Sequence, residues 1–291
     1  MTTSETIHVY GLVGSPVDHS LSPFIMERAF AEFDLDSVYV AFDVEPDLFP
    51  DLVQRLRTLG IAGAYITYPY KERILEFVDR RSPDVEMIRA ANTLRFEGGG
   101  WEAHNTDAPG VVNALEILGD VQPAGKRVFV FGAGGAGRAA GFGLLKAGAS
   151  CVTFGLRDPS KARRFIERYR DLFPDQRIES VSLMGDDPAR AIETAAVIIN
   201  ATPVGMAQAS SDESLGDESW INGSHLCFDF VYHRGETPFL AGAERRKART
   251  LDGLALLVAQ AQAAFRLWTG KEFSLERMYT AVAIEQQVNR E

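Results

Sequence analysis

Residues 127–137 read RVFVFGAGGAG, and this stretch decides the fold. Its first five residues are mostly apolar and predict a buried strand, and residues 138–146 predict a helix. In this strand, turn and helix context, Gly132 permits a tight turn, Gly134 lets a ligand approach the backbone, and Gly137 permits close packing of the helix. The turn therefore predicts a phosphate cradle for a dinucleotide. A glycine-rich turn without a ligand is the alternative.

Apolar strands alternate with helix-like segments on both sides of this stretch. Downstream, three further strands predict the rest of a doubly wound sheet: 151–154, 196–200 and 226–231. Upstream, the chain predicts strand, helix, strand, helix and strand over 7–13, 23–33, 39–44, 48–59 and 62–67. Such alternation is typical of a mostly parallel sheet covered by helices. The predicted fold class is α/β, with two domains.

Shorter segments complete the organisation of the chain. A glycine-rich turn at 96–101 predicts a hairpin, and residues 109–118 predict a helix that could connect two domains. An apolar helix is predicted over 254–267 and an amphipathic helix over 275–288. The Ser- and acid-rich stretch 208–219 predicts a flexible loop.

The composition limits the classes of partner. The 291 residues include 30 Lys and Arg against 40 Asp and Glu, a formal net charge of −10, and 46% of them are hydrophobic. The acidic balance argues against nucleic-acid and membrane-surface binding, since both rely on Lys and Arg. Cys151 and Cys227 are too few for a disulfide framework or a zinc site, and no metal is expected. Because the chain shows neither a secretory signal nor roughly 18 consecutive apolar residues, the expected location is the cytoplasm.

The tip of the second strand of the dinucleotide domain bears on which dinucleotide binds. An acidic residue commonly holds the ribose hydroxyls there, whereas this chain has Leu156 and then Arg157. Arginine suits a 2′-phosphate and predicts NADP, with NAD as the alternative. Asp158 has three open interpretations: its charge repels that phosphate, it binds a ribose hydroxyl, or it caps a helix that begins with Pro159.

Two hydroxyls, those of Ser20 and Ser22, stand two residues apart just before the helix predicted over 23–33. The N–H groups at the start of a helix attract anions, so these serines could hold a carboxylate. The alternative is that one of them simply caps the helix.

Polar motifs follow one another in order along the chain. They are GSP at 14–16, HSLSP at 19–23, GAYITYPYK at 63–71, ANTL at 91–94, NTD at 105–107, NATPVGM at 200–206, Tyr232, and the stretch from Gly253 through Gln260 to Gly270. This series resembles the shikimate dehydrogenase family, including its quinate/shikimate dehydrogenase relatives, from about Gly11 to Gly270.

The resemblance implies an N-terminal substrate-binding and catalytic domain over 1–108 and a Rossmann dinucleotide-binding domain over 109–255, with residues 256–291 packing back on the first domain. It implies an oxidoreductase of the chorismate pathway to aromatic amino acids. Hydride would pass between NADP(H) and a ring carbon of shikimate or a related carboxylate. Lys71 and Asp107 would handle the hydroxyl proton, because oxidising an alcohol releases a proton as well as a hydride.

The resemblance also assigns the other site residues by position. Those implied to hold the substrate carboxylate are Ser20, Ser22 and Tyr232, and those implied to hold the ring hydroxyls are Thr67, Asn92, Asp107 and Gln260. Those implied to border the cofactor are Gly132, Ala133, Gly134, Gly135, Ala136, Gly137, Arg157, Asp158, Thr202, Met206, Phe230 and Gly253. Plain structural alternatives stay open: Asn92 and Asn200 as strand-end residues, Tyr232 as an interior aromatic, and Gln260 as a polar residue on an apolar helix. The expected partner is a small carboxylate, bound by a monomer or a homodimer.

The chain departs from the family pattern at Tyr65, where the family has an asparagine that binds a substrate hydroxyl. The phenol either contacts the substrate in a different way, or narrows the pocket, or packs outward. Leu156 and Asp158 replace the Asn and Thr that flank the family's arginine. Three alternatives follow: a changed ring substrate such as quinate or aminoshikimate, use of NAD, or a non-catalytic dinucleotide or metabolite sensor on the same fold.

Overall fold

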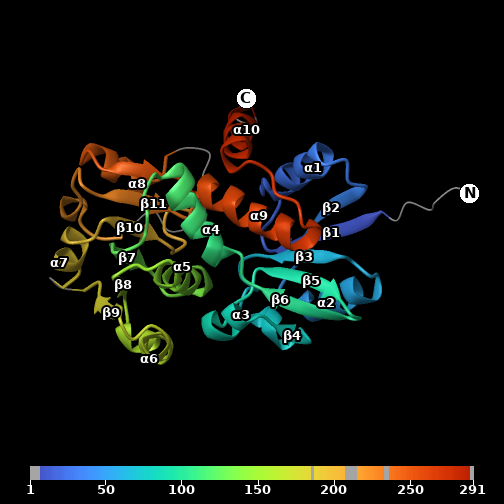
Figure 1. The fold of residues 1–291 in the computed structure, drawn as a ribbon, viewed down its shortest axis with the longest axis horizontal. Helices are drawn as coiled ribbons and strands as arrows, with labels where there is room; N and C mark the ends of the chain where they lie inside the picture. The colour runs from blue at the N-terminus through green and yellow to red at the C-terminus, as the bar shows by residue number, and fades with distance from the viewer. Residues whose placement is uncertain (1–6, 185–186, 207–214, 233–235, 289–291) are drawn as a thin grey trace, which may run out of the picture. The chain divides into compact units, whose positions relative to one another are not determined.

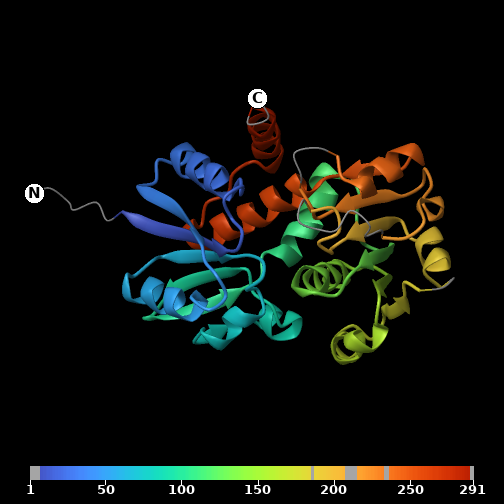
Figure 2. The same cartoon turned by 180° about the vertical axis from the view of Figure 1, so that it is seen from behind.

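Two six-stranded sheets organise the chain, which the computed structural model describes over residues 7–184, 187–206, 215–232 and 236–288 (Figure 1 and, from behind, Figure 2). Each sheet belongs to its own compact unit. The first unit consists of the chain up to Thr106 together with Gln260–Met278, and the second consists of Asp107–Ala259 together with the chain from Tyr279. The predicted domains, 1–108 with 256–291 and 109–255, stay a proposal about how function is divided.

The first unit holds a mixed sheet in the order β2-β1-β3-β5-β6-β4. Its strands are β1 (His8–Gly14), β2 (Ser37–Asp43), β3 (Gly63–Ile66), β4 (Arg80–Arg81), β5 (Thr93–Glu97) and β6 (Gly100–His104), and its helices include α1 (Ser22–Glu32), α2 (Phe49–Thr58) and α3 (Pro83–Ile88). The strand β1 pairs in parallel with β2 and β3, as the alternation predicts. In contrast, β5 runs antiparallel to β3 and β6. The predicted hairpin is confirmed, since its turn residues Gly98 and Gly99 both have positive φ, 61° and 80°.

The second unit holds a parallel sheet in the order β12-β11-β10-β7-β8-β9. Its strands are β7 (Arg127–Phe131), β8 (Cys151–Leu156), β9 (Arg177–Ser182), β10 (Val197–Asn200), β11 (Leu226–Asp229) and β12 (Arg249–Leu251). Its helices include α4 (Asp107–Asn113), α5 (Gly135–Lys146), α6 (Arg163–Leu172), α7 (Asp187–Glu193) and α8 (Pro238–Arg245). This order is that of a doubly wound sheet, with β7 beside the point where the winding reverses.

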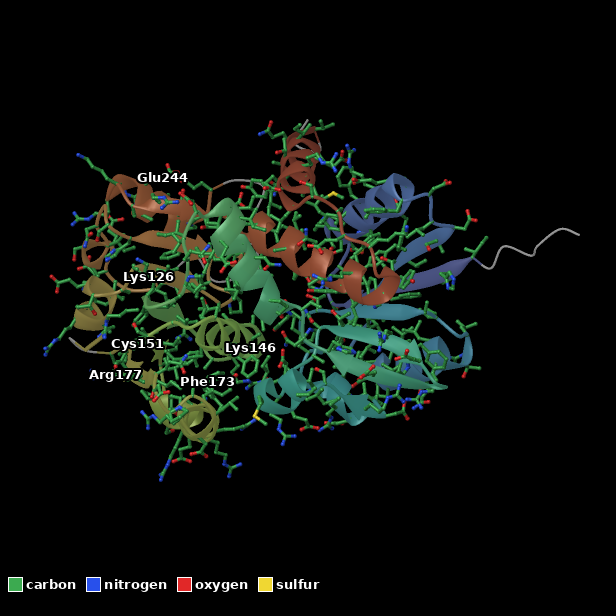
Figure 3. The ribbon with its side chains drawn as sticks, viewed as in Figure 1. Lys126, Lys146, Cys151, Phe173, Arg177 and Glu244 are labelled. Atoms are coloured by element: carbon green, nitrogen blue, oxygen red, sulfur yellow. The ribbon has the colours of Figure 1, made fainter. Side chains whose placement is uncertain are left out.

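One edge of this sheet is marked by Lys126, Cys151 and Arg177, which are labelled in Figure 3. Lys126 precedes β7, while Cys151 and Arg177 begin β8 and β9 and are register partners. The carboxyl ends of the parallel strands therefore meet at the opposite edge, where ligands of such folds bind. Both Cys151 and Cys227 are buried and free, as predicted.

One predicted segment differs from the structure, and another lies mostly outside the described residues. The helix predicted over 109–118 begins two residues earlier as α4, because Pro109 fits the first turn, where its missing N–H is not needed. Its last turn, Ala114–Leu118, is π-helical. Of the predicted loop 208–219, residues 208–214 lie outside the described residues, and the remainder leads into a 3₁₀ turn at Glu218–Trp220.

Two further helices, α9 (Gly253–Thr269) and α10 (Leu275–Val288), confirm the predicted C-terminal pair. Residues 253–259 of α9 belong to the second unit and the rest to the first. No helix in the described part of the chain is long and apolar enough to cross a membrane.

The α2 helix covers the first sheet with one apolar face. Phe49, Val53 and Leu56 recur at helical spacing, are at most 3% exposed, and pack in one cluster with Val13, Ile66 and Trp101 from the strands. The core of the first unit thus supports the ends of β1 and β3, from which several predicted site residues follow.

The α5 helix packs unusually close to its neighbours because it is rich in glycine. A Cβ atom at Gly141 would stand 2.3 Å from the Phe154 ring of β8, and one at Gly143 would stand 2.3 Å from the carbonyl oxygen of Ala108 in α4. Larger side chains at Gly141 or Gly143 would force α5 away from β8 or from α4.

The C-terminal half of α9 is anchored in the first unit by Trp268. Its indole stacks on Tyr10 with ring centroids 4.8 Å apart, and its Nε1 donates to the carbonyl oxygen of Leu94 at 2.9 Å. Gly63 leaves room for the indole, since a Cβ atom there would stand 2.4 Å from Nε1.

We expect Gly63→Ala to lower the free energy of unfolding of the first unit by about 1–3 kcal/mol, because the indole and the β3 backbone must move apart. Urea unfolding followed by tryptophan fluorescence measures the change. Val40→Ala, at an exposed position of β2, is the control and should change stability by less than about 0.5 kcal/mol. Equal midpoints for Gly63→Ala and wild type would contradict the expectation.

Candidate active site

Ser20 and Ser22 lie together at the start of α1. The backbone N–H of Ser22 donates to Oγ of Ser20 at 3.2 Å, and Ser22 is only 4% exposed. The N-cap residue of α1 is Leu21, and no side chain caps the helix, so the capping alternative is not supported for either serine. The Ser20 hydroxyl that accepts from Ser22 still has its own O–H to donate to an anion.

Asn92 is a buried polar side chain of the first unit with several hydrogen-bond partners. It is fully buried, and its Oδ1 accepts from the backbone N–H of Thr106 at 2.7 Å and from the hydroxyls of Thr93 and Thr106, each at 3.2 Å. Its backbone N–H donates to the carbonyl of His104, and its carbonyl accepts from the N–H of Ile66. These bonds fix its amide in one orientation. They are more than a residue at the end of a strand needs to hold its place.

Tyr65 points into the protein, so the outward-packed alternative is wrong. The residue is 5% exposed, and its phenol oxygen accepts from Nδ2 of Asn92 at 2.7 Å. The bulky residue that replaces the family's asparagine is thus hydrogen-bonded to another predicted substrate residue.

Thr67 and Lys71 follow β3 and are tied to the same region through their backbones. The N–H of Thr67 donates to the carbonyl of Val13 at 2.9 Å, and the carbonyl of Lys71 accepts from Ala91 at 2.7 Å. Thr67 also packs against Gly14, where a Cβ would stand 2.2 Å from its methyl group. The structure therefore brings Tyr65, Thr67, Lys71 and Asn92 into one neighbourhood of the first unit.

Two predicted residues lie beside the points where the chain passes between the units. Asp107 is the first residue of α4 in the second unit and is 2% exposed. Gln260 lies on α9 at the first position that belongs to the first unit, and is 3% exposed. Both polar side chains are buried, which is uncommon unless they are hydrogen-bonded or functional.

The glycine turn has the geometry of a phosphate cradle. Gly132 has φ of +91°, and a Cβ at Gly137 would stand 2.4 Å from the carbonyl oxygen of Gly132. Gly134 is exposed, a Cβ atom there would point into open space, and the residue precedes α5 without a side-chain cap. The sequence Gly132, Ala133, Gly134, Gly135, Ala136 and Gly137 thus leaves the backbone at the start of α5 open to an anionic ligand.

Arg157 and Asp158 are both exposed at the tip of β8, but their settings differ. Asp158 accepts from the backbone N–H of Ser160 at 3.0 Å and from its hydroxyl at 2.6 Å, directly before a 3₁₀ turn that begins with Pro159. The two hydrogen bonds from Ser160 are the main cause of a lowered pKa of the Asp158 carboxyl. The capping interpretation of Asp158 is therefore supported, and Arg157 carries the argument for NADP.

The segment after β10 lies against the glycine turn. A Cβ at Gly132 would stand 2.8 Å from the methyl group of Thr202, and the side chain of Ala201 comes within 3.6 Å of a Cβ at Gly137. Met206 closes a turn onto the carbonyl of Pro203 and is 38% exposed. Thr202 is thus placed at the predicted cofactor site by direct contact with the cradle.

Phe230 and Tyr232 follow β11. The N–H of Phe230 donates to the carbonyl of Asn200 at 2.9 Å, and its ring meets Phe228 edge-on. Tyr232 is half-buried, so it is not an interior aromatic. Gly253 has a structural reason to be glycine, since a Cβ there would stand 2.6 Å from the backbone nitrogen of Tyr232.

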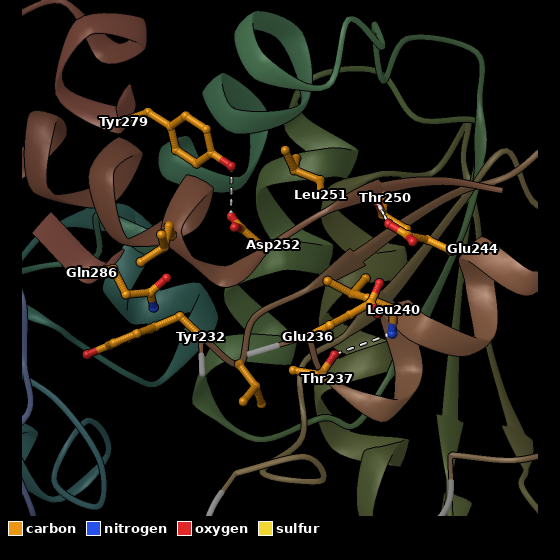
Figure 4. Close-up of a pocket in the computed structure, with 12 residues that line it drawn as sticks. Tyr232, Glu236, Thr237, Leu240, Glu244, Thr250, Leu251, Asp252, Tyr279 and Gln286 are labelled. Atoms are coloured by element: carbon orange, nitrogen blue, oxygen red, sulfur yellow. Dashed lines mark hydrogen bonds between the residues drawn. The ribbon is translucent and has the colours of Figure 1, made fainter. Parts of the chain in front are cut away.

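A pocket of about 290 Å³ opens in the second unit beside Tyr232 (Figure 4). Thr237, Asp252 and Tyr279 are among its lining residues, and the hydroxyl of Tyr279 donates to Asp252 at 3.2 Å. Burial raises the pKa of the Asp252 carboxyl. Glu236 and Glu244 are among the described residues that line it.

Sequence reasoning missed three residues that shape the site. Thr93 and Thr106 lie within the motifs at 91–94 and 105–107, but the sequence assigned them no role. In the structure, both donate to the amide oxygen of Asn92. Asp229 lies at the end of β11 and is fully buried. A single acid inside the apolar stretch LCFDFV was the available signal for Asp229.

Comparisons with known proteins agree on one family. A model of the shikimate dehydrogenase substrate binding domain matches residues 12–94, and a model of the shikimate 5′-dehydrogenase C-terminal domain matches residues 253–283. The shikimate dehydrogenase (NADP(+)) of Methanopyrus kandleri is 37% identical over 275 residues, which cover 94% of this chain and 94% of that protein.

Solved structures give the same result. Shikimate 5-dehydrogenase of Thermus thermophilus, in complex with NADP(H) and shikimate, has a TM-score of 0.82 at 31% identity, covering 94% of this chain and 98% of that one. Shikimate 5-dehydrogenase of Listeria monocytogenes, in complex with shikimate and NAD, has a TM-score of 0.84 at 28% identity, covering 97% and 99%. The likeness extends over nearly the whole length in sequence and in fold, and the chain belongs to the shikimate dehydrogenase family.

Proposed function

We propose that the protein is an NADP-dependent shikimate dehydrogenase, which interconverts 3-dehydroshikimate with NADPH and shikimate with NADP⁺. The observation that carries this function is the nearly full-length likeness to proteins named shikimate dehydrogenase (NADP(+)). The buried polar cluster around Asn92 and the open glycine turn are the two structural features that such a reaction needs.

The glycine turn fits the pyrophosphate of NADP. Gly132 and Gly137 allow the close turn, while exposed Gly134 leaves space at the start of α5. Thr202, Met206, Phe230 and Gly253 lie on the segments that follow β10 and β11 or begin α9, where they would border the nicotinamide. When bound, NADP supplies the hydride acceptor in one direction and the hydride donor in the other.

Arg157 would select NADP over NAD. Its guanidinium suits the 2′-phosphate at the tip of β8, and the Asp158 carboxylate beside it is engaged by Ser160. A carboxylate used as a helix cap is less able to bind a ribose hydroxyl, which is the feature that NAD enzymes use at this strand tip.

The substrate would be held at two ends. Ser20, Ser22 and Tyr232 would bind the carboxylate, and the hydroxyl donors at the start of α1 suit an anion. The residues proposed for the ring hydroxyls are Thr67, Asn92, Asp107 and Gln260, with Tyr65 acting on them through Asn92. Buried groups of this kind reject analogues that lack a hydroxyl, because the protein groups are then left unpaired.

Lys71 would take the proton of the substrate hydroxyl during oxidation and return it during reduction. Alcohol oxidation breaks a C–H and an O–H bond, so a positioned base is needed as well as a hydride acceptor. To accept this proton Lys71 must react as a neutral amine, and Asp107 would orient the Lys71 side chain and the substrate hydroxyl through its carboxylate.

The location, the oligomeric state and the division of the chain into two domains are inferred from the same function. We infer a cytoplasmic enzyme that acts as a monomer or homodimer on a small carboxylate, with residues 1–108 and 256–291 serving the substrate and 109–255 the cofactor. The acidic net charge of −10 supports a small-molecule partner rather than a nucleic acid.

We expect Lys71→Ala to lower kcat for shikimate oxidation by at least about 100-fold, because the proton acceptor is lost. The rate of NADPH formation at saturating shikimate and NADP⁺ measures this loss. Lys271→Ala is the matched control, since Lys271 is an exposed lysine of the same unit. Turnover above a tenth of the wild-type value in Lys71→Ala would exclude the proton role, and a wild type without any turnover would favour the sensor.

We expect Arg157→Ala to raise KM for NADP⁺ by about 10- to 100-fold and to leave KM for NAD⁺ nearly unchanged, because only NADP carries the 2′-phosphate. Steady-state kinetics with both cofactors measures the split. Arg163→Ala, which removes an exposed arginine paired with Glu167 in the same unit, should alter neither KM. A parallel rise of both constants would argue against phosphate recognition by Arg157.

We expect Tyr65→Phe to lower kcat/KM for shikimate about tenfold and to leave KM for NADP⁺ within twofold, because the buried Nδ2 of Asn92 loses an acceptor. Tyr68→Phe, at a 62% exposed position of the same segment, is the matched control. Assays of Tyr65→Asn with shikimate and quinate compare the phenol with the family's amide. Unchanged kinetics in Tyr65→Phe would leave the phenol oxygen without a part in substrate recognition.

A further inference from the structure

Asp229 is a buried carboxylate that the proposed reaction does not use. It ends β11, is fully inaccessible, and receives three hydrogen bonds from three segments. Asn200 donates to Oδ1 at 2.8 Å, the backbone N–H of Val231 donates to Oδ1 at 3.0 Å, and the hydroxyl of Thr237 donates to Oδ2 at 2.6 Å. Bonds to an ionised carboxylate are about twice as strong as neutral ones.

Through its bond to Asn200, Asp229 helps to fix the segment that follows β10. Asn200 and Asp229 are register partners on neighbouring strands, and Nδ2 of Asn200 also donates to the carbonyl of Val204 at 3.0 Å. Oδ1 of Asn200 accepts from the N–H of Thr202 at 3.0 Å and from its hydroxyl at 2.7 Å. The whole turn 200–204 is thus bound to one amide, and that amide is held by Asp229.

The turn 200–204 also contacts the glycine turn at Gly132. The methyl group of Thr202 would stand 2.8 Å from a Cβ at Gly132, and Gly132 is the residue that needs its left-handed φ of +91°. A displacement of Thr202 would therefore either press on the glycine turn or leave a gap beside it.

The bond to Thr237 fixes the other side of the carboxylate. Thr237 is the N-cap residue of α8, and its Oγ1 also accepts from the N–H of Leu240 at 3.3 Å, as Figure 4 shows. Asp229 therefore joins the start of α8, the end of β11 and the turn after β10. The turn after β10 carries the predicted cofactor residue Thr202 and is followed by Met206, and Phe230 directly follows β11.

Burial disfavours the ionised form of the Asp229 carboxyl in the folded protein. Burial raises the pKa of Asp229 to about 6, and the nearby carboxylate of Asp252 adds to the rise. A raised carboxyl pKa means that the folded state favours the neutral form, so this group lowers stability as the pH rises from about 4 to above 6. At pH 8 an uncharged side chain of the same shape would be tolerated at least as well.

We propose that Asp229 is a positioning residue for NADP: through Asn200 and Thr202 it holds the turn after β10 against the glycine cradle. The proposal rests on the proposed use of NADP. The proposal predicts that Asp229 strengthens the binding of NADP without raising the stability of the protein, because a buried negative charge is unfavourable for folding.

The test is Asp229→Asn at pH 8, with the dissociation constant of NADPH measured by fluorescence titration, KM for NADP⁺ and shikimate measured by turnover, and Tm measured in the absence of ligands. We expect both NADP constants to rise about tenfold, KM for shikimate to stay within twofold, and Tm to be equal or higher. An NADPH dissociation constant within twofold of wild type would overturn the proposal. So would a fall in Tm with equal losses for both substrates, which marks a merely structural role.

Conservative variants of Thr237 provide a second test if Asp229→Asn does not fold. Thr237→Ser keeps the hydroxyl that donates to Asp229 and should bind NADPH as the wild type does, whereas Thr237→Val should weaken NADPH binding severalfold. Equal affinities in these two variants would also overturn the proposal. Asp217→Asn, which changes an exposed capping carboxylate of the same unit, is the matched control and should leave NADPH binding unchanged.

Failure of this inference can be told apart from failure of the proposed function. NADPH binding is measured without turnover, whereas wild-type oxidation of shikimate tests the reaction itself. A wild type that binds NADPH but does not oxidise shikimate would fail as a shikimate dehydrogenase, and the effect of Asp229→Asn on NADPH affinity would still decide the role of Asp229.

Discussion

The close approach between Gly132 and Gly137 is the constraint on which the second unit depends. A Cβ at Gly137 would stand 2.4 Å from the carbonyl oxygen of Gly132, so α5 can start directly beside the end of β7 only with glycine there. The same close packing recurs at Gly141 and Gly143, which bring α5 against β8 and α4. Removing side chains at these positions lets the start of a helix face the carboxyl edge of a parallel sheet, where backbone N–H groups are available to phosphate.

The first unit meets a different requirement, which is to keep polar groups in a fixed place inside a protein core. Asn92 is fully buried, yet its amide oxygen receives three donors and its amide nitrogen donates to Tyr65. Such a network costs conformational freedom and desolvation, and it holds one orientation only when every member is paired. The network lies next to Lys71, whose carbonyl is bound by the residue just before Asn92.

Particular residues show how far sequence reasoning extends. The strand, turn and helix around Gly132 were predictable because their signals are local: apolar runs, glycine spacing and a helix start. The hairpin at Gly98 and Gly99 was predictable for the same reason. The antiparallel pairing of β5 with β3 was not, since nothing in an apolar strand states which neighbour it will find. Asp229 was missed because an isolated acid in an apolar strand does not reveal its donors, which lie 29 positions before it and two and eight positions after it.

The α/β class, the glycine turn between β7 and α5 and the family were all predictable from the sequence alone, because these rest on residue types at fixed spacing. The sequence also placed Lys71 and Asn92 in motifs that imply a dehydrogenase. Only the tertiary structure decided that Tyr65 points inward onto Asn92, that Asp158 is engaged as a cap, and that Asp229 holds the turn after β10. The physical reason is that hydrogen bonds depend on the direction and separation of atoms, and those are set when distant segments pack against one another.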